Sequence, residues 1–293
     1  MIVIFGSINL DLIFALDRLP LAGETLLGPG VVIQPGGKGA NQAVAAARDG
    51  AGVAMAGAVG RDALASGALA LLKQADMDLS RVAETEAATG CAAICTDKAG
   101  RNLIAVGSGA NLAARAAQVE DALLGPGTTV VLQMEVPAAE NAALIARARS
   151  RGARIVLNLA PALPLDPAAL RAVDVLVVNE HEAAWLARQF GAAATASGLR
   201  LALGPTVVRT LGERGAEFAS ADGAGRVAAF AVTAVDTTAA GDCFTGVLAA
   251  ALDRGLKLTD SLLRASAAAA ICCTRAGSQT TLPSAEETDR FLR

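Results

Sequence analysis

The chain has 293 residues, of which 53% are hydrophobic and 18% charged, so it can form one large or two small domains with a sizeable core. The net charge is −3 and no basic run or aromatic interleaving occurs, which argues against a nucleic-acid partner. No apolar run reaches the roughly 18 residues that a membrane-spanning helix needs.

Strand-like apolar runs alternate with helix-like patterns along the chain. The run at 1–5 lacks a basic leader and meets Asp11 early, so we interpret it as a buried strand and not a signal peptide. The strand-like runs are 1–6, 52–58, 128–133, 153–158, 174–178 and 205–211, and the helix-like stretches are 38–49, 62–75, 137–151, 181–190, 241–254 and 260–274. This alternation predicts a parallel sheet covered by helices, which binds ligands beyond the carboxyl ends of its strands.

Two segments, residues 11–34 and 89–106, break this alternation. The first is punctuated by proline and glycine, and the second has the pattern of a hairpin across a turn. We expect them to form a small antiparallel sheet outside the main one.

Polar residues stand just past predicted strands, where a ligand would bind. Asn9 and Asp11 follow the first strand, and Glu135 follows the run at 128–133. Amides and carboxylates at such positions bond to sugar hydroxyls. An ordinary polar turn is the alternative for Asn9 and Asp11, and a helix-start charge is the alternative for Glu135.

The segment Gly-Gly-Lys-Gly-Ala-Asn at 36–41 precedes a helical pattern. Its glycines permit a tight turn and a close backbone approach, Lys38 can meet an anion, and Asn41 can bond to hydroxyls. A glycine-rich turn with a solvated lysine is the alternative. The segment is not a Walker P-loop, because Val32 and Gly39 occupy positions that need glycine and Ser or Thr.

Two further segments follow predicted strands, and each can be explained either by a ligand contact or by a purely structural role. Asn179 and Glu182 have the spacing of a capping box, which we favour over a water-mediated contact from Glu182 to magnesium. The turn at 210–215 suits contact with a nucleotide, but a plain hairpin explains it too. Gly277, after the helix-like stretch 260–274, has the position of a C-cap.

The five cysteines are Cys91, Cys95, Cys243, Cys272 and Cys273. Their odd number and spacing favour reduced thiols in a cytoplasmic protein. Cys91 and Cys95 resemble half a metal site, but small buried hydrophobes are the preferred interpretation because the chain has one histidine.

Residues 236–242, Asp-Thr-Thr-Ala-Ala-Gly-Asp, are the most informative segment. Apolar residues follow them at helical spacing, so the segment is a loop that opens into a helix. The first amides of a helix have no partner, and the helix dipole favours an anion there. Asp242 adds a carboxylate in the same turn. Phosphate-binding amides beside a base indicate phosphate transfer to a hydroxyl.

Placed together, these segments resemble the ribokinase family of sugar kinases, also called the PfkB carbohydrate kinases. The resemblance covers nearly the whole chain and is carried by the segments at 36–41 and 236–242. It implies a doubly wound, mostly parallel α/β domain formed by residues 1–10, 35–88 and 107–293. It also implies a β-sheet lid formed by residues 11–34 and 89–106, often shared between two subunits of a homodimer.

The resemblance assigns roles to individual residues. Asp242 would be the base that takes the proton of the sugar 5-hydroxyl, and the amides around Ala239, Ala240 and Gly241 would hold the developing charge. The sugar would contact Asn9, Asp11, Gly37, Lys38, Asn41, Glu135 and Asp242. ATP would contact Asn179, Thr210, Gly212, Gly215, Gly241 and Ser266.

The resemblance also implies two metal ions. Mg²⁺ would bind mainly to the phosphates of ATP, with Glu182 contacting it through water. K⁺ would be held by Asp236, Thr238, Cys272, Arg275, Gly277 and Thr281, mostly through backbone carbonyls.

The expected activity is ATP-dependent phosphorylation of D-ribose at the 5-hydroxyl. Another pentose such as deoxyribose, or a nucleoside, is an alternative substrate, although the lid shows no obvious aromatic residue for a base. A sugar sensor without catalysis is a further alternative, against which the intact Asp242 argues.

Overall fold

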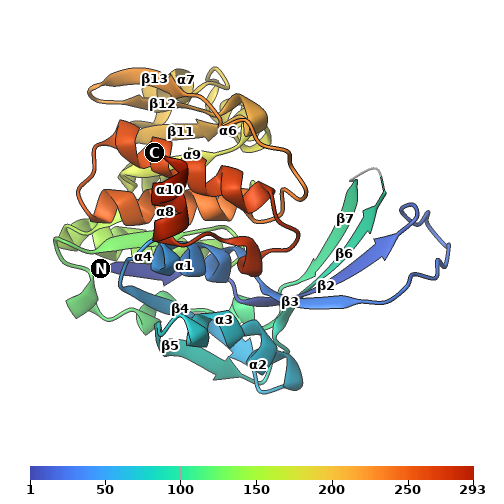
Figure 1. Cartoon of the computed structure of the whole chain (residues 1–293). Helices are drawn as coiled ribbons and strands as arrows, with labels where there is room; N and C mark the ends of the chain where they lie inside the picture. The colour runs from blue at the N-terminus through green and yellow to red at the C-terminus, as the bar shows by residue number, and fades with distance from the viewer. Residues whose placement is uncertain (99–100) are drawn as a thin grey trace.

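A large, mostly parallel sheet forms the centre of the molecule, as the computed structural model of residues 1–98 and 101–293 shows (Figure 1). Its nine strands run in the order β13-β12-β11-β10-β9-β8-β1-β4-β5. The strands are β1 (Ile2–Phe5), β4 (Val53–Gly60), β5 (Asp78–Thr85), β8 (Thr129–Leu132), β9 (Arg154–Asn158), β10 (Val175–Val178), β11 (Thr206–Thr210), β12 (Ala216–Ser220) and β13 (Gly223–Val227). Strand β12 pairs in the antiparallel sense with both of its neighbours, β11 and β13, and the other pairs of this sheet are parallel.

Helices cover both faces of this sheet. The helices are α1 (Lys38–Arg48), α2 (Ala63–Ala68), α3 (Ala70–Gln74), α4 (Ala138–Arg151), α5 (Pro167–Ala172), α6 (Glu180–Phe190), α7 (Ala196–Leu203), α8 (Ala240–Asp253), α9 (Leu258–Cys273) and α10 (Ala285–Phe291). Successive residues of a strand point to opposite faces, so the buried strands carry apolar residues on both sides. None of the helices in the described ranges is long and apolar enough to cross a membrane.

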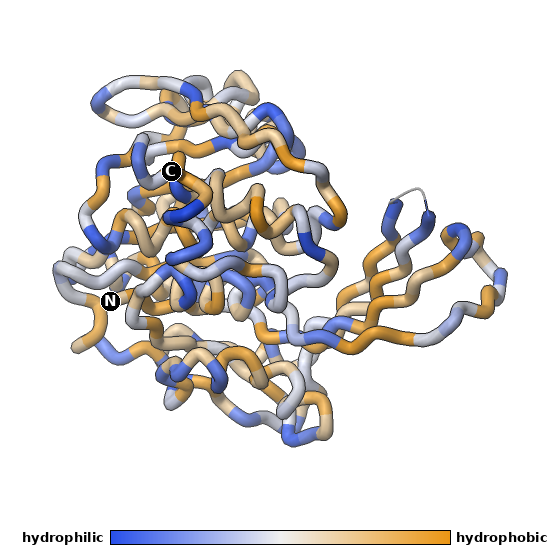
Figure 2. Tube along the Cα trace, viewed as in Figure 1, coloured by the Kyte–Doolittle hydropathy of each residue, from blue (hydrophilic) through white to orange (hydrophobic). Residues whose placement is uncertain are grey.

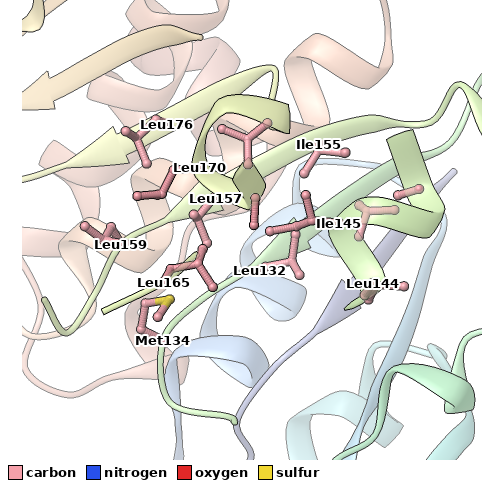
Figure 3. Packing of buried hydrophobic residues seen from close by; sticks show 14 of the residues in the cluster. Leu132, Met134, Leu144, Ile145, Ile155, Leu157, Leu159, Leu165, Leu170 and Leu176 are labelled. Carbon is pink, nitrogen blue, oxygen red and sulfur yellow. The ribbon is translucent and has the colours of Figure 1, made fainter. Parts of the chain in front are cut away.

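The two faces of the sheet therefore belong to two separate cores. Val3 and Phe5 of β1 pack into one core with α4 to α7, part of which is drawn in Figure 3. Ile2 and Ile4 pack into the other core with α1, α8 and α9. The alternation along one short strand thus confirms the α/β class with helices on both sides.

A smaller four-stranded sheet projects from the main body (Figure 1). Its order is β3-β2-β6-β7, with β2 at Asn9–Leu16, β3 at Val32–Gly36, β6 at Gly90–Asp97 and β7 at Asn102–Gly107. The pairing is antiparallel except between β2 and β6, which run parallel. Every residue of β7 is exposed, and apolar residues line these strands (Figure 2).

The structure extends and corrects the predicted elements. All six predicted strands form, but the stretch 62–75 is broken at Leu69 into α2 and α3. The missed elements are β5, β12, β13, α5, α7 and α10. They lie at sheet edges or on the surface, where short or partly exposed segments carry a weak hydrophobic period.

Candidate active site

The candidate residues gather at one edge of the main sheet. The strands β1, β8, β9, β10 and β11 are parallel, so the segments that follow them emerge at the same edge. Asn9 and Asp11 are not in a turn, as one alternative held, but open strand β2. The site therefore lies where the small sheet joins the main one.

Asp11 is buried at this junction, with 6% of its surface exposed. Strand β3 pairs beside it, and a β-carbon added at Gly36 would lie 2.0 Å from its Oδ2 atom. Burial, and then repulsion by Glu135 and Asp242, raise the pKa of Asp11 to about 7, while Lys38 lowers it. Asp11 thus changes charge near neutral pH.

Asn9 is held by a second buried amide. The Asn111 Nδ2 atom donates to Asn9 Oδ1 at 2.6 Å, and Asn111 Oδ1 accepts from the Ile8 amide at 2.9 Å. These bonds leave the NH₂ group of Asn9 as its available donor. Asn111 is not among the predicted site residues.

The glycine-rich segment brings the start of α1 against the end of β1. Gly37 has φ +88°, and a β-carbon there would lie 2.8 Å from the Asn9 nitrogen, so glycine is required. Glu135 Oε2 accepts from Ser7 Oγ at 2.6 Å and from the Lys38 amide at 3.2 Å. Glu135 therefore bonds to the start of α1 and not to α4, the helix that follows it in the sequence, whose first turn carries Glu140.

Lys38 is half-buried among carboxylates. Its pKa is raised, chiefly by Asp242 and further by Glu135, Glu182 and Asp11, although burial opposes this. A simple solvated turn does not describe such a lysine, whose positive charge faces carboxylates from four segments of the chain.

The loop at 236–242 opens into α8 as predicted. Ala239, its N-cap, adopts a left-handed conformation with φ 58°, which is uncommon for a residue with a side chain. The Ala240 amide donates to the Thr237 carbonyl at 3.2 Å, whereas the next two amides, those of Gly241 and Asp242, have no partner within the helix. Gly241 is exposed, and no atom lies within 4 Å of where its β-carbon would be, so the loop at the start of α8 is open on this side.

Asp242 is buried and receives hydrogen bonds from two consecutive residues of α1. Asn41 Nδ2 donates to its Oδ2 atom at 2.9 Å, and Gln42 Nε2 donates to its Oδ1 atom at 3.0 Å. Gln42 was not predicted as a site residue, nor was Asn158, whose Oδ1 atom accepts from Gln42 at 3.1 Å. The sequence could have indicated both as site residues, because Gln42 adjoins Asn41 and Asn158 ends a predicted strand.

The capping box at the start of α6 is present, as the preferred interpretation held. Glu182 Oε2 accepts from the Asn179 amide at 2.7 Å, and Asn179 Oδ1 accepts from the Glu182 amide at 2.9 Å. Burial raises the pKa of Glu182, although its bond from Asn179 lowers it. Both carboxylate oxygens of Glu182 thus accept hydrogen bonds from Asn179.

The turn after β11 forms a hairpin, which was the alternative interpretation of residues 210–215, since β11 pairs with β12 in the antiparallel sense. Gly212 and Gly215 both have positive φ, at 59° and 84°. Thr210 Oγ1 donates to the Val178 carbonyl at 3.4 Å, which ties the turn to the end of β10. Ser266 is buried on α9, and within the described ranges no hydrogen bond joins it to this turn.

The residues proposed for a monovalent cation form a connected cluster. Asp236 Oδ1 accepts from Thr238 Oγ1 at 2.6 Å, and Asp236 Oδ2 accepts from the Gly277 amide at 3.1 Å. Cys272 Sγ lies 3.0 Å from Thr281 Oγ1 and 3.8 Å from the Thr238 carbonyl oxygen. Arg275 Nη1 donates to the Thr281 carbonyl at 3.3 Å. Carboxylate, carbonyl and hydroxyl oxygens are a donor set that fits a hard cation.

Gly277 is not the αL-type C-cap of α9, because Thr274 caps that helix. It has φ +121°, and a β-carbon there would lie 2.8 Å from Thr280 Oγ1 and 2.9 Å from Gln34 Oε1. Glycine is therefore needed where the cation cluster meets strand β3.

Comparisons with known proteins define the class. Residues 1–285 match the family described as pfkB family carbohydrate kinase, and the chain belongs to this family of sugar kinases. It is 36% identical to a ribokinase of Schizosaccharomyces pombe, covering 98% of this chain and 96% of the relative. It is also 36% identical to a ribokinase of Haemophilus influenzae, covering 99% and 98%.

A solved structure agrees with the sequence relatives. The Arabidopsis thaliana ribokinase complexed with ribose and ATP superposes with a TM-score of 0.88 at 28% identity, covering 100% of this chain and 98% of that one. The fold and the family predicted from the two motif segments are therefore confirmed.

Proposed function

We propose that this enzyme transfers the γ-phosphate of ATP to the 5-hydroxyl of D-ribose and produces ribose 5-phosphate. One observation carries the proposal: a buried carboxylate, Asp242, lies in the first turn of α8 beside two helix amides without a partner in the helix. The relatives named ribokinase, and the related structure complexed with ribose and ATP, support the choice of substrates.

In the proposed mechanism Asp242 acts as general base. Its carboxylate accepts two amide bonds, and with about four lone-pair positions it retains room for a hydroxyl proton. Asp242 takes the proton as the 5-hydroxyl oxygen attacks phosphorus and the bond to the ADP oxygen breaks. The amides of Gly241 and Asp242 stabilise the developing negative charge, an effect of roughly 2.7–4 kcal/mol per donor in comparable sites.

The other site residues bind and orient the two substrates. Asn9, Asp11, Gly37, Lys38, Asn41 and Glu135 would hold the sugar, with Lys38 also neutralising the carboxylates around it. Asn179, Thr210, Gly212, Gly215 and Ser266 would hold the nucleotide. Mg²⁺ bound to ATP would neutralise phosphate charge, with Glu182 reaching it through water.

We propose that K⁺ binds at the cluster of Asp236, Thr238, Cys272, Arg275, Gly277 and Thr281. The cluster adjoins the loop that forms the anion hole, so an ion there would stiffen the loop. The enzyme is expected to turn over faster in potassium than in sodium buffer, and equal rates would contradict this assignment.

We propose that the segments 11–34 and 89–106 act as a lid over the sugar and that two copies of the chain meet through it. Val32, Ile104 and Val106 are about half exposed, and strand register places them on the face that carries Asp11. A partner covering this face would also exclude water near the sugar. The chain's free cysteines favour a reducing, cytoplasmic location.

A substrate panel tests the activity. ADP release is measured with ribose, deoxyribose, other pentoses and nucleosides at equal concentration. D-ribose is expected to give the highest kcat/KM, and a higher value for deoxyribose or a nucleoside would replace ribose as the substrate. Sugar binding without ADP release would favour a sensor instead.

A further inference from the structure

We infer that Gln42 is a positioning residue for the base, through a chain of buried amides that runs from Gln133 to Gln42 to Asp242. This inference rests on the proposed role of Asp242. Gln133 Nε2 donates to Gln42 Oε1 at 2.7 Å, and Gln42 Nε2 donates to Asp242 Oδ1 at 3.0 Å. Gln42 and Gln133 are completely buried and Asp242 is 7% exposed.

The surroundings allow only one orientation of the Gln42 amide. Its nitrogen lies between two acceptors, the carboxylate of Asp242 and the Asn158 Oδ1 atom, while its oxygen receives the Gln133 donor. Turning the amide over would place its oxygen against the Asp242 carboxylate and its NH₂ group against the NH₂ group of Gln133. Such a buried mismatch is costly, so the chain holds the donor toward Asp242.

The far end of the chain is anchored to rigid elements. Asn141 Nδ2 of α4 donates to the Gln133 carbonyl at 2.7 Å. A β-carbon at Gly6 would overlap Gln133 Oε1, at 1.8 Å, so glycine leaves the space that this side chain occupies. Gln42 itself is in the first half of α1, beside Asn41. The orientation of Asp242 is thus set by the side chains of Gln133 and Gln42, whereas Asn141 bonds only to the backbone of Gln133.

This arrangement has a chemical consequence beyond packing. A donor bonded to a carboxylate favours its charged form, so losing the Gln42 donor should make the charged form of the Asp242 carboxylate less stable. The charged or titratable groups that act on or beside Asp242 are Lys38, Asp11, Glu182 and Cys272. These stay in place when only Gln42 is changed, so a shift in the titration of Asp242 reports on the amide.

The test uses two substitutions of similar size, Gln42→Met and Gln42→Glu. For Gln42→Met, kcat at saturating sugar is expected to fall about 10- to 100-fold, with sugar Kd changed less than threefold. The acidic limb of kcat against pH should move up by about one to two pH units. In Gln42→Glu the introduced carboxyl group, while protonated, donates as the amide does. This variant should therefore keep more activity at low pH and lose kcat at high pH, where two like charges repel.

A matched control separates positioning from stability. Asn141→Ala removes a buried amide bond of the same network without touching Gln42 or Asp242. This variant should lower the Tm but leave the low-pH side of the profile of kcat against pH unchanged. The inference is overturned if Gln42→Met shows an unmoved acidic limb, or if both Gln42 variants respond identically to pH.

A readout without turnover keeps this inference separate from the proposed function. The ¹³Cγ signal of Asp242, assigned by its absence in Asp242→Asn, is followed against pH in the sugar-free enzyme. Its midpoint should rise in Gln42→Met, and an unchanged midpoint in folded protein would overturn the inference. Failure of the wild-type enzyme to release ADP with ribose would instead overturn the proposed function.

Discussion

Asp11 illustrates how its surroundings set the charge of a single residue. Burial and the nearby carboxylates of Glu135 and Asp242 raise its pKa to about 7, so the free enzyme holds it protonated in mildly acidic solution. A carboxylate that accepts from two sugar hydroxyls binds best when ionised. Sugar binding should therefore be coupled to release of a proton.

This coupling predicts the pH dependence of ribose affinity. Below a pKa of about 7 the carboxylate must lose its proton before it accepts both hydroxyls, so Kd should fall up to tenfold per pH unit as pH rises from 5 to 7 and level off above. Calorimetry in buffers of different ionisation enthalpy measures the released proton. A Kd that is constant from pH 5 to 8, or proton uptake on binding, would rule the coupling out.

At the scale of elements, β3 pairs with β2 at the proposed sugar site. Asp11 pairs with Gln34, and Gly36 leaves no room for a β-carbon beside the Asp11 carboxylate. The same strand meets the cation cluster, because Ser278 Oγ donates to the Pro35 carbonyl at 2.9 Å and Gln279 Nε2 donates to the Gly36 carbonyl at 3.2 Å. Strand β3 thus lies beside both the residues proposed for the sugar and those proposed for the cation.

The variant Gly36→Ala tests this close approach. The added methyl group would overlap Asp11 Oδ2, so Asp11 must move and the Kd for ribose should rise at least about tenfold. The control is Gly30→Ala in the same segment, where no atom lies within 4 Å of the added carbon. Titration calorimetry compares the two, and equal affinities would show that β3 does not constrain Asp11.

Much of this element-scale organisation is readable in the sequence. The apolar runs of β1, β8 and β10 are buried throughout, and β9 is buried after its first residue, so their hydrophobic signal is strong. Strand β5 has no fully buried residue, and β12 carries the polar residues Glu217 and Ser220, so both lack that signal. The Gln42–Asp242 bond joins residues 200 positions apart, and no local pattern predicts such a pairing.

At the scale of the whole molecule, the small sheet stands away from the main body, and many of its residues are hydrophobic (Figure 2). The exposed ones include Val32, Ile33, Leu103, Ile104 and Val106. Two sheets of this kind can bury these side chains against each other, which would remove exposed strand edges as well. The expected homodimer would then close the two sugar sites together.

The register of β7 supplies a matched pair of variants for the dimer. Ile104 lies on the Asp11 face and Leu103 on the opposite face, and they are 52% and 47% exposed. A buried charge is costly, so Ile104→Glu should give a monomer in sedimentation experiments while Leu103→Glu stays a dimer. A dimer that survives Ile104→Glu would place the interface elsewhere.

The proposed role of Asp242 as the base of a ribose kinase is tested by the substitution Asp242→Asn. ADP release with saturating D-ribose and ATP is compared between the wild-type enzyme and Asp242→Asn, with ribose affinity measured by calorimetry. If Asp242 is the base, kcat falls about 10²- to 10⁴-fold while the Kd for ribose changes little. Turnover of Asp242→Asn near the wild-type rate would contradict this role.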